Sequence, residues 1–222
     1  MSVTSFRASL AALAFCTCAA SQAAIVVSNP PDQVYGTNMS FALVADNFTL
    51  GGIYAISGIR FWSIQSDAAD YSGNLYWAIY SNAPGSPGAV LQSATTAVVA
   101  VATGNSTGFG YAEYVFDIAV NFQLAAGDYW LALQNDALGS TTATEMLWET
   151  SSAGSGPTGQ YIDFSNNQGW VDTLNEHAFQ LTGQLVGDPP PPPPPGGVPE
   201  PSTLALLFAS LAAAVVLRRQ ST

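Results

Sequence analysis

His177 is the only histidine in the chain, so any Ser-His-Asp mechanism of hydrolysis would depend on it. It lies at the start of an expected strand, and no Gly-x-Ser-x-Gly nucleophile elbow accompanies it there. We therefore interpret His177 as a surface or strand-capping residue rather than a general base. A zinc site is also disfavoured, since one histidine and no cysteine in the mature domain cannot supply the usual set of ligands.

Acidic side chains are numerous, and a pair of carboxylates is what glycoside hydrolysis requires. Their spacing, however, singles out no pair. Asp67 and Asp70, together with the polar residues at 71–74, could place several oxygens around a Ca²⁺ ion within one loop. The spacing differs from that of an EF-hand, and a solvated acidic loop that binds no cofactor is the interpretation we favour.

The five tryptophans raise the question of carbohydrate binding, because an exposed indole can stack on the face of a sugar ring. Trp62, Trp77 and Trp130 lie within expected strands and are predicted to be core residues. Trp148 and Trp170 lie nearer to strand ends and loops, which makes them the better candidates for contact with a glycan. For Trp170, packing in the core is a slightly favoured alternative.

The elements that must position these residues are short runs rich in β-branched and aromatic residues, separated by Gly, Pro, Asn, Asp and Ser. The clearest run alternates apolar and polar residues, as a strand with one buried face does. The sequence predicts an all-β domain, an antiparallel two-sheet β-sandwich with jelly-roll-like connections. Turns are expected at 83–88 and 126–128, and strands at 40–44, 47–50, 56–64, 75–80, 91–102, 111–118, 129–134, 145–149, 160–164 and, most clearly, 178–186.

The charge balance of the domain limits its partners. Between Ile25 and Asp188 there are fourteen acidic residues and one base, Arg60, which gives a net charge of −13 with His177 neutral. Such a surface repels nucleic acid, anionic lipid headgroups and acidic polysaccharides. Divalent cations, neutral extracellular polysaccharides or another protein are therefore the permitted partners, while solubility alone also explains the acidity.

The N-terminal segment has the arrangement of a secretory signal peptide. Residues 1–23 contain a basic residue, then an apolar stretch, then small residues before the expected cleavage point. Cys16 and Cys18 would leave with this segment, so the mature domain would have no disulfide bond. A lipoprotein is the alternative, but a bulky residue precedes Cys16 where a small one is needed. Residues 24–188 have the length of a single domain.

The C-terminal segment begins with a linker and ends with a short apolar helix. Seven prolines and two glycines form the linker 189–197, and the proline run is predicted to be a semi-rigid spacer of roughly 22 Å. The expected transmembrane helix at 202–217 would be roughly 24 Å long, a marginal span of the bilayer. Arg218 and Arg219 follow as a membrane stop, which places the C-terminus inside the cell.

Between linker and helix lies the motif Val198, Pro199, Glu200 and Pro201, which the two prolines hold extended. The motif, the helix and the terminal arginine pair together resemble the PEP-CTERM sorting signal of Gram-negative bacteria. This resemblance implies an exosortase as partner, a transient membrane anchor, and a final place in the cell envelope, on the outer surface or in the extracellular matrix. A single-pass anchor that is never cleaved is the alternative.

The domain itself is similar to β-sandwich ectodomains often found in PEP-CTERM proteins, on the evidence of residues 46–50, 59–62, 84–88 and 122–133. That similarity implies a fold and a destination, and it carries no catalytic residues. We expect a non-enzymatic protein of the cell envelope or exopolysaccharide matrix. The alternatives are a carbohydrate-binding module in the matrix and a secreted glycan hydrolase, the latter retained because paired carboxylates are not excluded.

Overall fold

The structure is a computed structural model that describes residues 23–141, 144–154, 157–165 and 168–186. These residues are all-β apart from one 3-10 helix, η1 (Ala68–Asp70). No helix in this part of the chain is long and apolar enough to cross a membrane. The predicted linker, sorting motif and C-terminal helix lie outside the described residues, as does the predicted signal peptide up to residue 22.

The larger of two antiparallel sheets has eight strands and is built around β4 (Tyr54–Gln65). β8 (Ala112–Leu124) pairs along one edge of β4. On the other edge, β14 (Phe179–Leu185) pairs with the first part of β4, and β10 (Met146–Ser151) pairs with its last residues. The remaining strands of this sheet are β1 (Ala24–Asn29), β2 (Gly36–Asn38), β7 (Val101–Ser106) and β13 (Glu176–His177).

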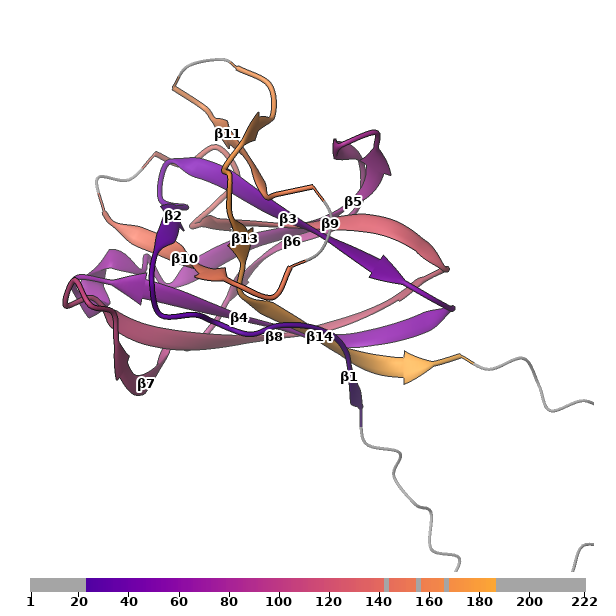
Figure 1. Cartoon of the computed structure of the whole chain (residues 1–222), viewed down its shortest axis with the longest axis horizontal. Helices are drawn as coiled ribbons and strands as arrows, with labels where there is room; N and C mark the ends of the chain where they lie inside the picture. The colour runs from indigo at the N-terminus through magenta and orange to yellow at the C-terminus, as the bar shows by residue number, and fades with distance from the viewer. Residues whose placement is uncertain (1–22, 142–143, 155–156, 166–167, 187–222) are drawn as a thin grey trace, which may run out of the picture. The chain divides into compact units, whose positions relative to one another are not determined.

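The second sheet has six strands, and every neighbouring pair is antiparallel. Its order is β12-β11-β3-β9-β5-β6, and Figure 1 shows it facing the first sheet. The strands are β3 (Ala42–Leu50), β5 (Asn74–Ala83), β6 (Ser86–Ala97), β9 (Gly127–Asn135), β11 (Gln160–Asp163) and β12 (Val171–Asp172).

The main hydrophobic core lies between the two sheets. On β4, Ile59 and Phe61 are buried while Arg60 between them is exposed, which is the alternation of a strand with one covered face. Phe61 stacks on Phe116 of β8, with 4.8 Å between the ring centroids. The chain passes from one sheet to the other repeatedly, for example at the β3–β4, β6–β7 and β8–β9 connections, so neighbouring parts of the sequence contribute to both sheets.

The predicted all-β fold and its two antiparallel sheets are confirmed. The strands predicted at 40–44 and 47–50 form one strand, β3, and the one predicted at 91–102 is divided between β6 and β7. The short strands β2, β12 and β13 were not predicted, nor was β1. The turn predicted at 83–88 is confirmed, because β5 and β6 form a hairpin in which Gly85 has a φ of 78°, a left-handed conformation that suits glycine.

Candidate functional site

Trp148 is fully buried, so the prediction of an exposed indole at this position is wrong. It lies within β10, where its neighbours across the sheet are Ser63 and Thr37, and its side chain points to the core between the sheets. The indole N–H donates a hydrogen bond of 2.8 Å to the Ala178 carbonyl oxygen. A sugar cannot reach this ring without opening the core.

Trp170 is half-buried and packs on the outer face of the six-stranded sheet. Its ring meets Tyr80 edge to face, with 5.6 Å between the centroids. It thus helps to cover a second, smaller hydrophobic cluster, which agrees with the core-packing alternative for this residue. Of the three tryptophans predicted to be core residues, Trp77 and Trp130 are buried and Trp62 is half-buried.

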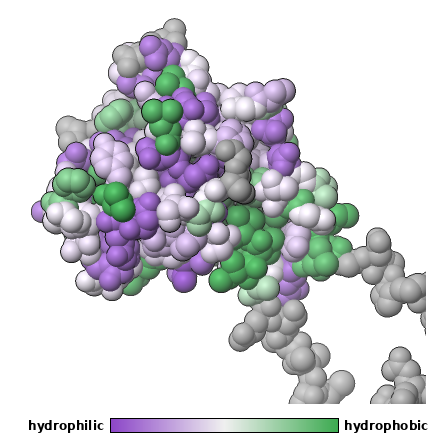
Figure 2. Space-filling view, in the orientation of Figure 1, coloured by the Kyte–Doolittle hydropathy of each residue, from purple (hydrophilic) through white to green (hydrophobic). Residues whose placement is uncertain are grey.

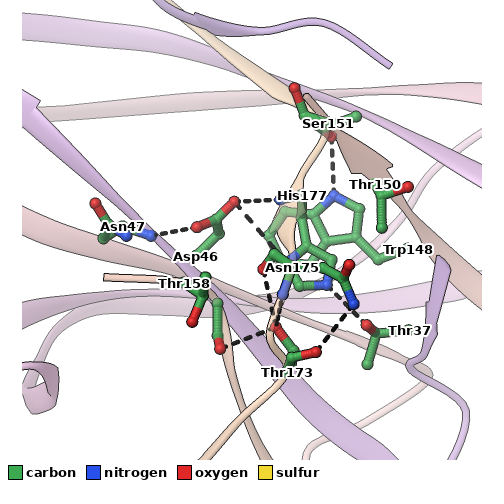
Figure 3. Close-up of polar contacts among 12 residues, drawn as sticks. Thr37, Asp46, Asn47, Trp148, Thr150, Ser151, Thr158, Thr173, Asn175 and His177 are labelled. Atoms are coloured by element: carbon green, nitrogen blue, oxygen red, sulfur yellow. Dashed lines mark hydrogen bonds and ion pairs between the residues drawn. The ribbon is translucent and has the colours of Figure 1, made fainter. Parts of the chain in front are cut away.

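His177 is also fully buried, and the prediction of a surface histidine is wrong. Figure 3 shows it between Asp46 and Thr37, next to the indole of Trp148. The His177 backbone N–H donates to Asp46 Oδ2, and the ring Nε2 lies 2.9 Å from the Thr37 hydroxyl oxygen. The strand-cap part of the interpretation holds in one respect: this backbone bond anchors β13 of one sheet to β3 of the other.

The order Asp46, His177, Thr37 has the residue types of a catalytic triad but not its geometry or charges. His177 Nδ1 is 3.9 Å from Asp46 Oδ2, too far for the hydrogen bond that orients a catalytic histidine. Burial lowers the pKa of His177 to about 3, so the ring is neutral. Burial and the nearby Glu176 raise the pKa of Asp46 well above its usual value. The cluster therefore lacks a basic histidine, and the raised pKa of Asp46 disfavours the ionised aspartate that a triad uses.

The Gly-x-Ser-x-Gly spacing occurs once at residues 104–108, in β7 and the turn that follows it, and not beside His177. A nucleophile elbow needs a strand that turns sharply into a helix. Here the segment leads through a turn into β8, so Ser106 has no elbow geometry.

Glu113 and Glu149 form a buried acidic pair that the sequence did not single out. Both side chains are covered, at 2% and 0% exposure, and Gln33 bridges them. The Gln33 backbone N–H donates to Glu149 Oε1 at 2.8 Å, and its side-chain Nε2 donates to Glu113 Oε2 at 3.3 Å. Burial and then the charge of Glu113 raise the pKa of Glu149 to about 8. No substrate can contact these carboxyl groups while the segment around Gln33 stays in place.

Asp67 and Asp70 cap the short helix η1. The Asp67 side chain accepts from the Ala69 backbone N–H, and the Asp70 side chain accepts from the Asp67 backbone N–H. Asp70 also accepts from the Ser66 hydroxyl, and these bonds lower its pKa. Both carboxylates thus have a local role, and no cluster of three or more metal-ligating side chains occurs among the residues the structure describes.

An open groove lies on the outer face of the eight-stranded sheet, where β2, β10 and β4 meet. Its volume is 540 Å³, and Ile64 and Leu147 lie in its lining. Tyr35 and Phe109 line it with 57% and 74% of their surface exposed, values high for aromatic side chains. Tyr111 completes the aromatic lining and donates a hydrogen bond of 2.9 Å to the exposed Glu145 carboxylate.

The groove was not predicted because its residues come from four separate parts of the chain. Phe109 did carry a local signal: it stands between two glycines in a loop, where a large apolar side chain has no strand face to bury. Tyr35 carried a similar signal, because it follows a turn segment that contains two prolines. Tyr35 and Phe109 are therefore exposed aromatic residues of the kind that Trp148 was predicted to be.

A second apolar surface lies where β1 begins and β14 ends (Figure 2). Ile25, Ile53 and Leu185 are exposed there. Their side chains offer hydrophobic area but no carboxylate, hydroxyl or imidazole group. This surface therefore adds no candidate for catalysis or polar recognition.

Comparison with known proteins identifies the C-terminal segment. Residues 197–220 match the family model of the PEP-CTERM protein-sorting motif, which confirms the resemblance seen at Val198, Pro199, Glu200 and Pro201. No curated protein matches the chain. The motif indicates an exported protein that is targeted by an exosortase, and it leaves the β-domain to be understood from its own structure.

Proposed function

We propose that this protein is exported across the inner membrane of a Gram-negative bacterium, is sorted by an exosortase, and acts as a non-enzymatic component of the cell envelope or exopolysaccharide matrix. The observation that carries the proposal is the match to the PEP-CTERM sorting motif at 197–220, which follows the all-β domain in the sequence. The apolar helix expected at 202–217 would hold the chain in the membrane until the exosortase acts near the motif. The domain would then remain as the mature protein.

Two features of the domain support a role without catalysis. The residue types needed for hydrolysis are buried in the His177 cluster and in the Glu113–Glu149 pair, and hydrogen bonds within the fold occupy most of their polar atoms. A general base must lie within hydrogen-bond reach of a substrate proton. These groups instead tie separate strands together.

Mass spectrometry of the mature C-terminus, in hosts with and without the exosortase, tests the sorting step. We expect a terminus near Glu200 in the complete host and an intact Arg219 in the host that lacks the enzyme. Glu200→Ala should block processing in the complete host, whereas Pro193→Ala in the linker should not. An intact Arg219 in both hosts would overturn the proposal.

A second candidate function, recognition of a neutral glycan, is favoured by the groove. Tyr35, Phe109 and Tyr111 offer aromatic surfaces on which a sugar ring can stack, and the exposed Glu145 carboxylate offers oxygens that accept hydrogen bonds from sugar hydroxyls. The carboxylate and the acidic domain disfavour anionic sugars. This candidate adds a ligand to the envelope role without changing the route of export.

Binding of the protein to an array of neutral oligosaccharides tests this second candidate. Tyr35→Ala and Phe109→Ala should each weaken binding about tenfold or more, because each removes one stacking surface. Phe41→Ala is the matched control, since Phe41 is a 39% exposed aromatic residue outside the groove. Equal loss in all three variants, or no glycan bound by the wild type, would reject it.

A further inference from the structure

One side of the β-sandwich carries two edge strands with no charged residue. β6 is the last strand of the six-stranded sheet, and β7 pairs only with β8 at the margin of the other sheet. Residues 98–100 connect them, so both edges lie on the same side of the molecule. Residues 71–112 contain no Asp, Glu, Lys, Arg or His, although the domain around them carries fourteen acidic residues.

These edges lack most of the features that usually prevent pairing with another chain, because they carry no charge and β6 is long. An edge strand presents unpaired backbone N–H and C=O groups, and proteins protect it with charges, prolines, bulges or short length. β6 is twelve residues long, and its proline, Pro87, stands at its beginning. Val90 and Leu91 in its middle part are 49% and 42% accessible, and the consecutive residues Gln92 and Ser93 after them are exposed, so both faces are open there. A bulge at Leu91 interrupts the pairing with β5, and from Gln92 to Ala97, where that pairing is regular, the strand is open to a partner.

The edge is also held in a fixed place. The Tyr71 hydroxyl donates to the Val98 carbonyl oxygen at 2.9 Å and accepts from the Val98 N–H at 3.2 Å. β5 pairs with β6 from Asn74↔Ala97 to Ala83↔Ser86. A strand fixed at its far end and along one edge needs little ordering to bind a partner on the other edge.

The charge distribution selects the partner. Two copies of a domain with a net charge of −13 repel each other wherever acidic surfaces face. The β6 edge is the side on which two copies can meet without placing carboxylates against each other. A basic partner would instead be attracted to the acidic faces, and the neutral edge would offer it no electrostatic attraction.

We infer that β6 pairs with β6 of a second copy of this chain. An antiparallel arrangement about a two-fold axis would join the two six-stranded sheets into one continuous sheet, with backbone hydrogen bonds as the main contacts. Val90 and the bulged residue Leu91, both exposed, would pack against the second copy. The pairing is a property of the β-domain and does not depend on sorting or on the groove.

Sedimentation velocity of the full chain in a mild non-ionic detergent, over a range of protein concentrations, tests the inference. We expect a reversible dimer in the wild type. Val90→Asp with Leu91→Asp should weaken it about tenfold or more, because charged side chains at the edge would oppose pairing and would add to the repulsion between the two copies. Leu138→Asp is the matched control, since Leu138 is 49% exposed, as Val90 is, but lies in the turn after β9.

Hydrogen exchange on the same samples locates the contact. Amide protection in residues 90–97 should increase with protein concentration in the wild type and in Leu138→Asp, but not in the double variant. A wild type that stays monomeric, a dimer that survives the double substitution, or protection that rises elsewhere and not in β6 would each overturn the inference. Unchanged protection of β5 and β9 in the double variant shows that the fold is intact.

Discussion

Burial decides what the titratable residues of this domain can do. His177, Asp46 and Glu149 are residue types of catalytic sites, yet each is fully buried. Burial shifts the pKa of each side chain in the direction that favours its neutral form. For the carboxyl groups that shift is upward, and for the histidine it is downward. Neutral groups of this kind can share hydrogen bonds inside a core, where charged ones would cost several kcal/mol each.

Glu149→Gln should stabilise the protein at alkaline pH. The folded-state pKa of Glu149 is about 8, against an ordinary value of 4.5. Its favourable contribution is complete below about pH 4.5 and is lost as the pH rises through about 8. A glutamine imitates the protonated carboxyl group, so the variant should be more stable by on the order of 2–4 kcal/mol at about pH 9.

Thermal unfolding of both proteins between about pH 5 and about pH 9 measures this difference. Asp46 and Glu176 have pKa values shifted in the same direction, so part of the decline will remain in the variant. Glu145→Gln is the control, because Glu145 is exposed. Parallel curves for the wild type and Glu149→Gln would show that Glu149 is ionised in the folded protein.

Trp148→Phe should destabilise the domain by about 2–3 kcal/mol. The change removes the indole hydrogen bond to the Ala178 carbonyl oxygen and leaves a space beside Phe61 and Phe179. Urea unfolding gives the free energy. Trp62→Phe, at a half-buried position, should cost clearly less. Equal costs would mean that the buried hydrogen bond adds little to the stability of the core.

At the scale of strands, local pattern and long-range pairing explain different parts of the fold. Residues 56–64 and 178–186 were predictable because apolar and polar residues alternate in their central parts, and this alternation matches the burial seen at 59–61 in β4 and at 179–182 in β14. β12 and β13 have two residues each and exist only through their partners. No local pattern can specify a strand of that length.

The division of 91–102 into two strands was hidden for a related reason. From Ser93 onward the run consists of β-branched and small residues without a turn signal, so its pattern favours one long strand. The corner at Val98 is made by the Tyr71 hydroxyl, which comes from a distant loop. The same limit applied to Trp148. The predicted strand ended at residue 149, whereas β10 continues to Ser151, where it pairs with β13, and the pairing of β2 beside Trp148 was not predicted.

Gly183→Ala should loosen the pairing between β14 and β4. A Cβ atom at position 183 would lie 2.5 Å from the Ala55 carbonyl oxygen, a backbone atom that cannot move aside alone. The register of the two strands already shifts between Thr182 and Gly183. We expect a loss of about 1–3 kcal/mol in urea unfolding and faster hydrogen exchange at the end of β14.

Gly51→Ala is the control for this substitution, because no atom lies within 4 Å of the Cβ that it would add. Its effect should stay within about 0.5 kcal/mol. If Gly183→Ala were equally mild, the β14–β4 pair would have to relax by shifting its bulge, and the close approach of the two backbones would have no structural importance.

At the scale of the whole domain, almost no basic residue balances the acidic charge. Arg60 is the only base, and it forms a two-bond ion pair with Asp117 across β4 and β8, at 2.7 and 2.8 Å. The pair is exposed and contributes little stability. The remaining carboxylates lie outside the 71–112 segment, so the molecule has acidic surfaces and one neutral side.

This charge distribution predicts how the proposed β6 dimer responds to salt. Repulsion between two acidic domains acts over about 30 Å at 0.01 M salt and about 8 Å at 0.15 M, while backbone hydrogen bonds at a neutral edge are not screened. Raising the salt concentration over that range should therefore strengthen association of the wild type, as measured by sedimentation equilibrium. An interface based on ion pairs, such as one through Arg60, would weaken instead. Dimers that dissociate on adding salt would thus exclude the β6 edge as the contact, whatever their stoichiometry.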